Sequence, residues 1–220
     1  MIKVAIDGPA GAGKSSIAKA VSKQLGFVYI DTGAMYRAVA VYAIENGIEI
    51  SEEAFSKSVL DEIEIDISYD ESGQKIFLCG KDVTERIRCS DASIGASNVA
   101  VIPAVRLKLV DLQRELANKA SVIMDGRDIG TYVLPDAQVK IFLTASVEER
   151  AKRRFLEMKE KGVEADLEQV KKDIEYRDKN DSERKFAPLK RADDAVLVDS
   201  SNMTIEEVIK KITEIIKGAM

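Results

Sequence analysis

The sequence contains no histidine, and this absence excludes several kinds of catalytic site. Ser-His-Asp triads, Cys-His pairs and histidine-ligated metals all need an imidazole ring. Only two cysteines occur, Cys79 and Cys89, and their spacing is not that of metal ligands. We therefore expect two free intracellular thiols, and any enzyme activity must depend on carboxylates, lysine, arginine, backbone dipoles or a borrowed metal ion.

The sequence also lacks long apolar runs and a surplus of positive charge. No apolar run approaches the roughly 18 residues of a membrane span, and the segment "MIKVAID" enters a strand-like run directly, without the regions of a secretion signal. A net charge of -5 argues against a binder of nucleic-acid polymers or membrane surfaces, although it leaves room for a local basic pocket. We expect a cytoplasmic protein, and a monomer.

The chain of 220 residues, 45% hydrophobic and 32% charged, is long enough for one domain with a small insertion. Its β-branched apolar runs are continuous, which is typical of parallel strands covered on both faces. Helical patterns such as Lys14 to Leu25 lie between them, so the sequence predicts a doubly wound α/β fold with three layers and a five-stranded parallel sheet. The five runs are "IKVAID" (2–7), "FVYID" (27–31), "SVIMD" (121–125), "VKIFLT" (139–144) and "AVLVD" (195–199).

Four of the five runs reach an aspartate near their carboxyl ends: Asp7, Asp31, Asp125 and Asp199. Ligands of open α/β sheets bind at that edge. Aspartate is also a common helix N-cap and turn residue, so each one alone can equally be structural.

One stretch interrupts the alternation of strands and helices. The segment 63–84, "IEIDISYDESGQKIFLCGKDVT", has alternating apolar residues on both sides of "DESG". This pattern predicts a hairpin, which we interpret as a small β-rich insertion in the α/β core.

The segment "GPAGAGKS" (8–15) has the pattern G-x-x-x-x-G-K-[ST] between a predicted strand and a predicted helix, the context of a phosphate-binding P-loop. Its glycines let successive N–H groups point at phosphate oxygens, and the helix dipole adds positive potential. Lys14 is expected to reach the β- and γ-phosphates, and the hydroxyl of Ser15 suits Mg²⁺. The segment therefore predicts binding of a nucleoside triphosphate. The predicted ATP-binding residues are Gly8, Pro9, Ala10, Gly11, Ala12, Gly13, Lys14, Ser15 and Ser16.

The remaining sequence favours a small-substrate kinase. The base-reading N-K-x-D pattern of GTPases does not occur, and several arginines follow the P-loop. Arg127 directly follows the strand end "IMDG", on the expected ligand side, whereas Arg37 and Arg106 taken alone are more often solvated helix residues. Guanidinium groups suit phosphate oxygens, so these three arginines could converge on a second phosphate.

Two charged segments near the carboxyl-terminal end permit two interpretations. The segment "VEERAKRRFLEMKEKG" (147–162) carries Arg150, Arg153 and Arg154, and "EYRDKNDSER" (175–184) carries Arg177 and Arg184. They could be salt-bridged surface helices, or a mobile lid over about 148–185 whose arginines close on the transferred phosphoryl group.

Five segments in this order, "IDGPAGAGKSS", "DTGAMYR", "ASNVAVIPAVR", "DGRDIGT" and "YRDKNDSERKFAPL", give the chain a resemblance to the bacterial cytidylate kinase family over almost its whole length. That family transfers the γ-phosphoryl group of ATP to CMP or dCMP. The resemblance implies a nucleoside-monophosphate-binding insertion, a short helical lid, Mg²⁺ with ATP as donor, and ATP and CMP or dCMP as small-molecule partners.

The resemblance also implies roles for individual residues. Arg37 and Arg127 would hold the CMP phosphate, Asp128 would face the cytosine amine, and Lys14 would act in catalysis with Arg127 and the lid arginines Arg150, Arg153 and Arg154. Apart from the resemblance, Asp125 at the strand end could either orient the turn or face Mg²⁺ through water. The full set implied for CMP is Thr32, Gly33, Tyr36, Arg37, Ser97, Arg106, Gly126, Arg127, Asp128, Arg177, Asp181 and Arg184.

The chemistry of cytosine agrees with this assignment, because its exocyclic amine donates and a carboxylate accepts. Uracil would leave two acceptors facing each other, a mismatch that costs about 1–3 kcal/mol or more. The alternatives are a related kinase for UMP, AMP or shikimate, and an ATP-binding module without transfer activity.

Overall fold

The computed structural model describes residues 1–70, 73–160 and 162–220, and they form two compact units. Unit 1 comprises Met1–Tyr29 and Ala120–Met220, and unit 2 comprises Ile30–Lys119. Each unit has its own buried apolar cluster.

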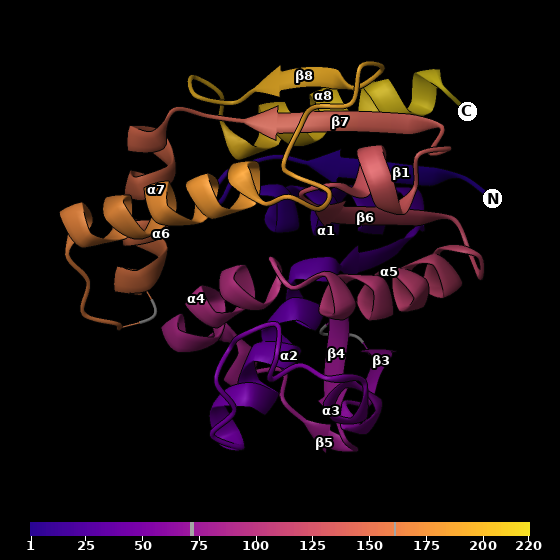
Figure 1. Cartoon of the computed structure of the whole chain (residues 1–220). Helices are drawn as coiled ribbons and strands as arrows, with labels where there is room; N and C mark the ends of the chain where they lie inside the picture. Colours follow the sequence, from indigo (N-terminus) through magenta and orange to yellow (C-terminus); the bar gives the residue numbers. More distant parts are fainter. Residues whose placement is uncertain (71–72, 161) are drawn as a thin grey trace. The chain divides into compact units, whose positions relative to one another are not determined.

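The main sheet has the strand order β2-β6-β1-β7-β8 (Figure 1). Strand β1 pairs in parallel with both β6 and β7, and β7 pairs in parallel with β8. This confirms the predicted α/β fold and its five-stranded parallel sheet, since each predicted run coincides with a strand to within one residue at either end. The strands are β1 (Lys3–Asp7), β2 (Val28–Asp31), β6 (Val122–Gly126), β7 (Val139–Thr144) and β8 (Val196–Asp199).

Two helices of unit 1 cover one face of this sheet: α1 (Lys14–Leu25) packs on β6 and β1, and α8 (Ile205–Gly218) packs on β7 (Figure 1). Their apolar sides, including Val21 and Ile212, are buried with the strands. Helix α8 begins with a capping box, in which Thr204 and Glu207 each accept a backbone N–H of the other.

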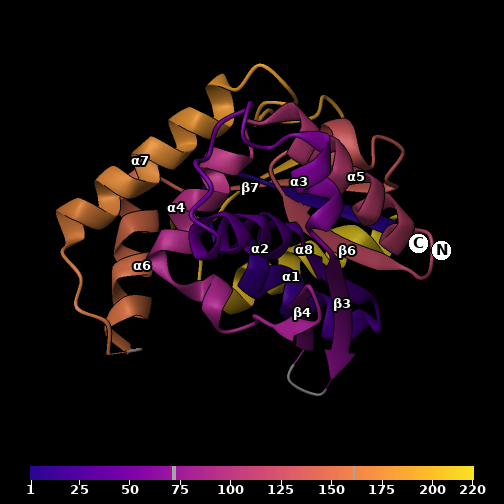
Figure 2. The same ribbon diagram turned by 60° about the horizontal axis from the view of Figure 1, so that its bottom comes forward.

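Helices α6 (Val147–Glu160) and α7 (Leu167–Glu183) lie side by side, as both Figure 1 and Figure 2 show. Asp166 caps α7 by accepting the N–H of Gln169 at 2.8 Å. Ala151, Val170 and Ile174 form the buried contact between the two helices. The predicted lid, about 148–185, falls on this pair, except for Lys161, which lies outside the described residues.

Unit 2 combines helices with the antiparallel sheet β3-β4-β5 (Figure 2). The two arms of the predicted hairpin coincide with β3 and β4. The predicted turn "DESG" includes Glu71 and Ser72, which lie outside the described residues. Unit 2 is wider than the predicted 63–84 insertion, because α2 and α4 pack against each other within it. The elements are α2 (Thr32–Glu45), α3 (Lys57–Glu62), β3 (Ile65–Asp70), β4 (Gly73–Leu78), β5 (Lys81–Asp82), a 3₁₀ turn (Arg86–Arg88), α4 (Ser90–Val99) and α5 (Pro103–Ala117).

Within the described ranges, no single helix has the length and apolar character needed to cross a membrane. Helices α4 and α5 meet that requirement only when joined, and they are bent by 102° at their junction.

Candidate active site

The loop between β1 and α1 has the backbone geometry of an anion site. Gly13, before the first residue of α1, has a left-handed φ of 84°, and no side chain in the described ranges caps the helix. The N–H groups of the first turn can therefore bind an anion, which the helix dipole also favours. A Cβ on Gly8 would lie 1.9 Å from the carbonyl oxygen of Leu143 in β7, so a side chain is excluded there.

Lys14 is buried in this loop, with 5% of its surface exposed. Its ammonium group donates to the carbonyl oxygen of Pro9 at 2.8 Å. Burial, followed by the charge of Arg127, lowers the pKa of Lys14 to about 7. An anionic phosphate beside the ammonium would raise this pKa again, because an opposite charge favours the protonated form.

Ser15 and Asp125 bring two oxygen ligands together at the start of α1. The Ser15 hydroxyl donates to Oδ2 of Asp125 at 2.9 Å, and the phenol of Tyr29 donates to Oδ1 at 2.9 Å. Hydroxyl and carboxylate oxygens are ligands that Mg²⁺ prefers. Among the residues that the structure describes, no group of three His, Cys, Asp or Glu side chains could hold a metal ion alone. The pair could therefore help to hold a magnesium ion, provided that water and phosphate oxygens supplied its other ligands.

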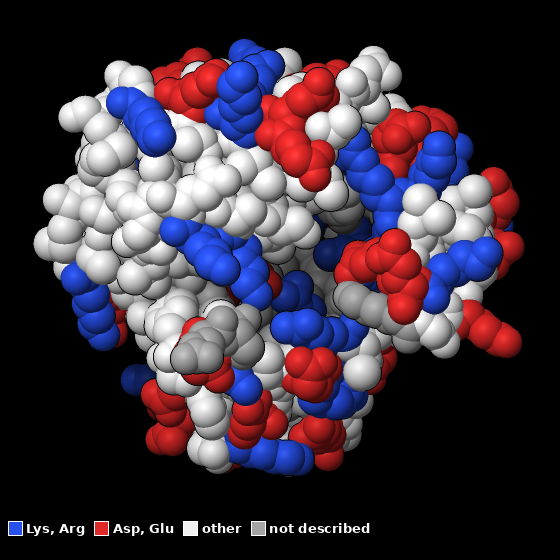
Figure 3. All heavy atoms as spheres, turned by 180° about the vertical axis from the view of Figure 1, so that it is seen from behind, with Lys and Arg blue, Asp and Glu red and all other residues white. Residues whose placement is uncertain are grey.

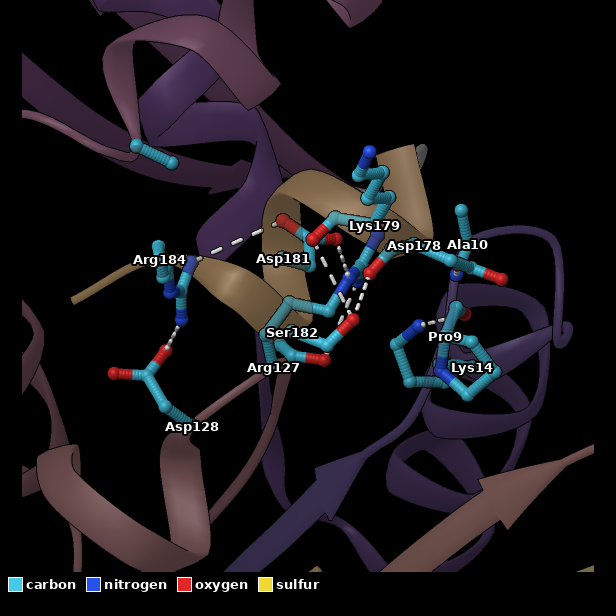
Figure 4. Close-up of polar contacts among 12 residues, drawn as sticks. Pro9, Ala10, Lys14, Arg127, Asp128, Asp178, Lys179, Asp181, Ser182 and Arg184 are labelled. Atoms are coloured by element: carbon cyan, nitrogen blue, oxygen red, sulfur yellow. Dashed lines mark hydrogen bonds and ion pairs between the residues drawn. The ribbon is translucent and has the colours of Figure 1, made fainter. Parts of the chain in front are cut away.

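A chain of alternating charges follows β6 in unit 1 (Figure 4). Arg127 Nε donates to Asp181 Oδ2 at 2.7 Å, and Arg127 also donates to the carbonyl oxygen of Gly126 at 3.3 Å. Asp181 Oδ1 lies 3.9 Å from Arg184, which donates to Asp128 Oδ1 at 3.0 Å. These charges come from two separate segments of the chain, 126–128 and 181–184, and only Arg127 keeps appreciable exposure, at 20% of its side chain.

The buried neighbours control the charge of this group. Burial opposes ionisation of Asp181, but the charges of Arg127 and Arg184 outweigh it and lower the pKa of Asp181 below its ordinary value. Burial likewise opposes the charge of Arg127, and the charge of Asp181 nevertheless raises the pKa of Arg127. Both residues are therefore charged at neutral pH.

Asp7 holds the backbone that follows these residues. Its two carboxylate oxygens accept the N–H groups of Ile129 and Gly130 at 2.8 and 2.7 Å. Burial raises the pKa of Asp7 to about 6, although the two N–H donors act in the opposite direction. Asp7 therefore fixes the turn that carries Arg127 and Asp128 out of the sheet.

The predicted CMP residues of unit 2 lie around the start of α2 and in α4 and α5. Asp31 caps α2 and also accepts from Arg37 at 2.8 Å. Arg106 is fully buried, with its guanidinium carbon 5.6 Å from the centre of the Tyr36 ring. Ser97 is 6% exposed, and its hydroxyl has no hydrogen-bond partner among the described residues. Thr32 is buried, and a Cβ on Gly33 would lie 3.1 Å from the guanidinium of Arg37.

The three arginines of α6 have different surroundings. Arg150 is buried and donates to the carbonyl oxygen of Ala145 at 3.0 Å. Arg153 donates to the hydroxyl and the carbonyl oxygen of Ser200 at 3.1 and 2.6 Å. Arg154 pairs with Glu157 at 2.9 Å and keeps 34% of its side chain exposed. Arg154 is therefore more accessible than Arg150, which is 4% exposed.

Comparison with known proteins decides the family. A family model described as cytidylate kinase matches residues 4–218. The chain belongs to the cytidylate kinase family. The resemblance drawn from the sequence is thereby confirmed, and as a family member the chain is an ATP-dependent CMP kinase.

The relatives of this kinase cover its whole length. The cytidylate kinase of Lactobacillus johnsonii is 52% identical over 217 residues, 99% of this chain and 94% of the relative. That of Caldicellulosiruptor saccharolyticus is 54% identical over 214 residues, 97% of this chain and 95% of the relative. A solved gluconokinase structure from Sinorhizobium meliloti 1021 is 13% identical, with a TM-score of 0.51 over 99% of this chain and 93% of that chain, and this likeness concerns the fold alone.

Within unit 1 the structure brings together many of the charged and polar residues predicted for the site of this kinase. Sequence reasoning assigned no site role to Asp7, Tyr29 or Asp178. Tyr29 donates to Asp125, Asp178 accepts the N–H of Ala10, and Asp7 interacts electrostatically with Lys14 and Asp128. A sequence signal existed only for Asp7, as an aspartate at a strand end, and for Asp178, within "YRDKNDSER". The predicted residues brought together include Lys14, Ser15, Asp125, Arg127, Asp128, Arg177, Asp181 and Arg184.

Proposed function

We propose that the kinase binds the ATP phosphates with residues 8–16 and aligns them with the phosphate of CMP beside Arg127. The observation that carries this proposal is the electrostatic link between Lys14 and Arg127, whose charges act on each other in unit 1. Two neighbouring cations destabilise each other's charged form, and anionic phosphates placed near them would stabilise both charges. The CMP phosphate is already anionic at neutral pH, so its transfer requires alignment and charge neutralisation and no general base.

The residues proposed to bind CMP are those that the family resemblance implies. Arg37 binds the phosphate together with Thr32, Gly33 and Tyr36, while Ser97 and Arg106 face the base. Arg127 and Gly126 contact the phosphate, Asp128 the base, and Arg177, Asp181 and Arg184 the ribose. The hydroxyl of Ser97, buried without a partner among the described residues, supports a ligand contact there.

Selection of cytosine is proposed to depend on Asp128. Its carboxylate oxygen Oδ1 accepts from Arg184, and a carboxylate is a suitable hydrogen-bond acceptor for the cytosine amine. Uracil offers an oxygen at that position and would be rejected by about 1–3 kcal/mol. Because a contact to the 2′-hydroxyl is separate from this discrimination, we expect dCMP to be accepted as well.

The arginines of α6 are proposed to have two roles in the lid: contact with the phosphoryl group and support of the helix. Arg154 keeps 34% of its side chain exposed, and it exchanges Glu157 for a phosphoryl oxygen when the lid closes. Arg150 and Arg153 support the helix from which it extends, since both bind backbone carbonyls. Under this proposal Arg154 is the one of these three arginines that contacts the transferred group directly.

Mg²⁺ is proposed to be held by the Ser15 hydroxyl, with Asp125 acting through water. When bound with ATP, the ion neutralises charge on the β- and γ-phosphates. Tyr29 keeps the Asp125 carboxylate oriented for this role through its hydrogen bond to Oδ1.

We further propose that the kinase works as a cytoplasmic monomer on small substrates only. Each group named above comes from one chain, so the reaction requires no second copy. Lys and Arg lie interspersed with Asp and Glu over the face drawn in Figure 3, which supports small-molecule partners over a nucleic-acid polymer. Sedimentation of the protein at catalytic concentration tests the monomer.

A nucleotide panel at fixed ATP and Mg²⁺ tests the proposed function. We expect phosphorylation of CMP and dCMP to exceed that of UMP and AMP. Faster transfer to UMP, AMP or shikimate would refute the assignment of Asp128 and Ser97 to cytosine. ATP binding without ADP formation with any acceptor would refute the transfer reaction itself.

A further inference from the structure

Asp178, on α7, is bound to the backbone of the P-loop (Figure 4). Its Oδ1 accepts the N–H of Ala10 at 2.9 Å, and its Oδ2 accepts from Arg150 at 2.6 Å. The same Arg150 nitrogen donates to the carbonyl oxygen of Ala10 at 2.7 Å. Ala10, Asp178 and Arg150 thus form a closed set of charge-assisted hydrogen bonds, which are shorter and stronger than neutral ones.

Close packing accompanies these hydrogen bonds. A Cβ built on Gly11 would lie 3.2 Å from Cβ of Arg150 and 3.3 Å from Cδ1 of Ile174. The P-loop backbone therefore lies directly against α6 and α7 at this point. Arg150 is 4% exposed and Ile174 is 3% exposed, so no water layer separates the loop from the helices. A shift of the loop at Ala10 or Gly11 must move these two helices with it.

The same helix carries residues proposed to bind CMP. Arg177 immediately precedes Asp178, and Asp181 lies three residues after it, on the neighbouring turn. Asp181 in turn holds Arg127 at 2.7 Å. A displacement of α7 at Asp178 therefore reaches Arg127 through a single helical turn and one ion pair.

We propose that Asp178 is a positioning residue that couples the ATP site to the CMP site. ATP phosphates order the P-loop, and because Asp178 joins the P-loop to α7, this also restricts the motion of α7. The first nucleotide therefore reduces the conformational-entropy cost of binding the second. By thermodynamic linkage, each nucleotide then raises the affinity for the other by the same factor. This inference rests on the proposed function, which assigns Arg127, Arg177 and Asp181 to CMP.

Calorimetric titration of CMP with and without a non-hydrolysable ATP analogue and Mg²⁺ measures this coupling. We expect the wild-type kinase to bind CMP at least about fivefold more tightly with the analogue, within the usual range of coupling between sites. In Asp178→Asn the carboxamide keeps one acceptor but loses the charge toward Arg150, and we expect the ratio of the two affinities to fall to about one.

Asp173→Asn is the matched control, because it removes the same charge from the same helix. Its carboxylate accepts from the Gln169 side chain at the surface, and we expect this variant to keep the wild-type ratio. A wild-type ratio near one, or an unchanged ratio in Asp178→Asn, overturns the proposal. Failure of CMP to bind the wild-type kinase in either titration would instead count against the proposed function.

Hydrogen exchange on the unaltered kinase makes the test independent of how well Asp178→Asn folds. The ATP analogue alone should slow exchange of the α7 amides around 177–183, which lie outside the P-loop itself. Protection confined to the P-loop and α1 would overturn the proposal, because the link through Asp178 requires α7 to respond.

Discussion

Replacing Asp128 with asparagine should destabilise the kinase strongly, because it leaves Arg184 buried beside a neutral side chain. The two side chains are 6% and 3% exposed and lie 3.0 Å apart. At an effective dielectric constant near 20, their attraction is about 5 kcal/mol. Two effects partly offset this lost attraction: asparagine avoids the desolvation penalty of a buried carboxylate, and Arg184 still lies 3.9 Å from Asp181. We therefore expect the free energy of unfolding to fall by about 3 kcal/mol, the lower end for a broken buried pair.

Urea denaturation and thermal unfolding measure this loss. For a chain of this length, about 3 kcal/mol corresponds to a decrease in Tm of roughly 6–12 °C. Asp194→Asn is the control: its carboxylate pairs with Lys140 at the similar distance of 2.8 Å in the same unit but is 65% exposed. Exposed pairs contribute about 0–1 kcal/mol. If the two variants have the same free energy of unfolding, the argument from burial is refuted.

Three other perturbations test the site and its support. Arg127→Ala should weaken CMP binding and lower kcat by at least about tenfold, while the Kd for ATP changes less than twofold. An equal loss of affinity for CMP and ATP would instead indicate that Arg127 contacts ATP. Gly8→Ala should lose about 3 kcal/mol or more in unfolding free energy, because its Cβ would lie 1.9 Å from the Leu143 carbonyl oxygen. In the control Gly47→Ala the glycine also has a positive φ but faces open space, so the loss should be only about 1–2 kcal/mol. Similar losses in the two variants would contradict the steric argument. Asp7 has a folded-state pKa of about 6 against an ordinary 3.8, so the folded protein binds the proton of Asp7 more tightly than the unfolded chain does. The free energy of unfolding should therefore fall by about 3 kcal/mol as the pH rises from about 4 to 6. Asp7→Asn should lose this pH dependence, and a urea-denaturation profile of this variant that matches the wild type over that range would exclude Asp7 as its source.

The elements of the fold were largely predictable because their patterns are local. Continuous apolar runs identified all five strands of the parallel sheet, and Gly26 and Pro103 marked a helix end and a helix start. The P-loop was equally predictable, since its glycine spacing, Lys14 and the following helix occupy one short segment. The extent of unit 2 was not, because the packing of α2 against α4 joins residues far apart in the sequence.

The sequence by itself determined which chemical groups the chain carries: a glycine-rich loop with Lys14, several arginines that follow it, and carboxylates at strand ends. Only the tertiary structure decided how each charge is used. Arg150 and Arg154 look alike on one helix, yet Arg150 is buried against the P-loop and Arg154 is only partly buried beside Glu157. Asp178 meets Ala10 across 168 residues of chain. Such pairings form because the packed helices bury particular side chains next to each other. Local sequence patterns do not specify which side chains these are.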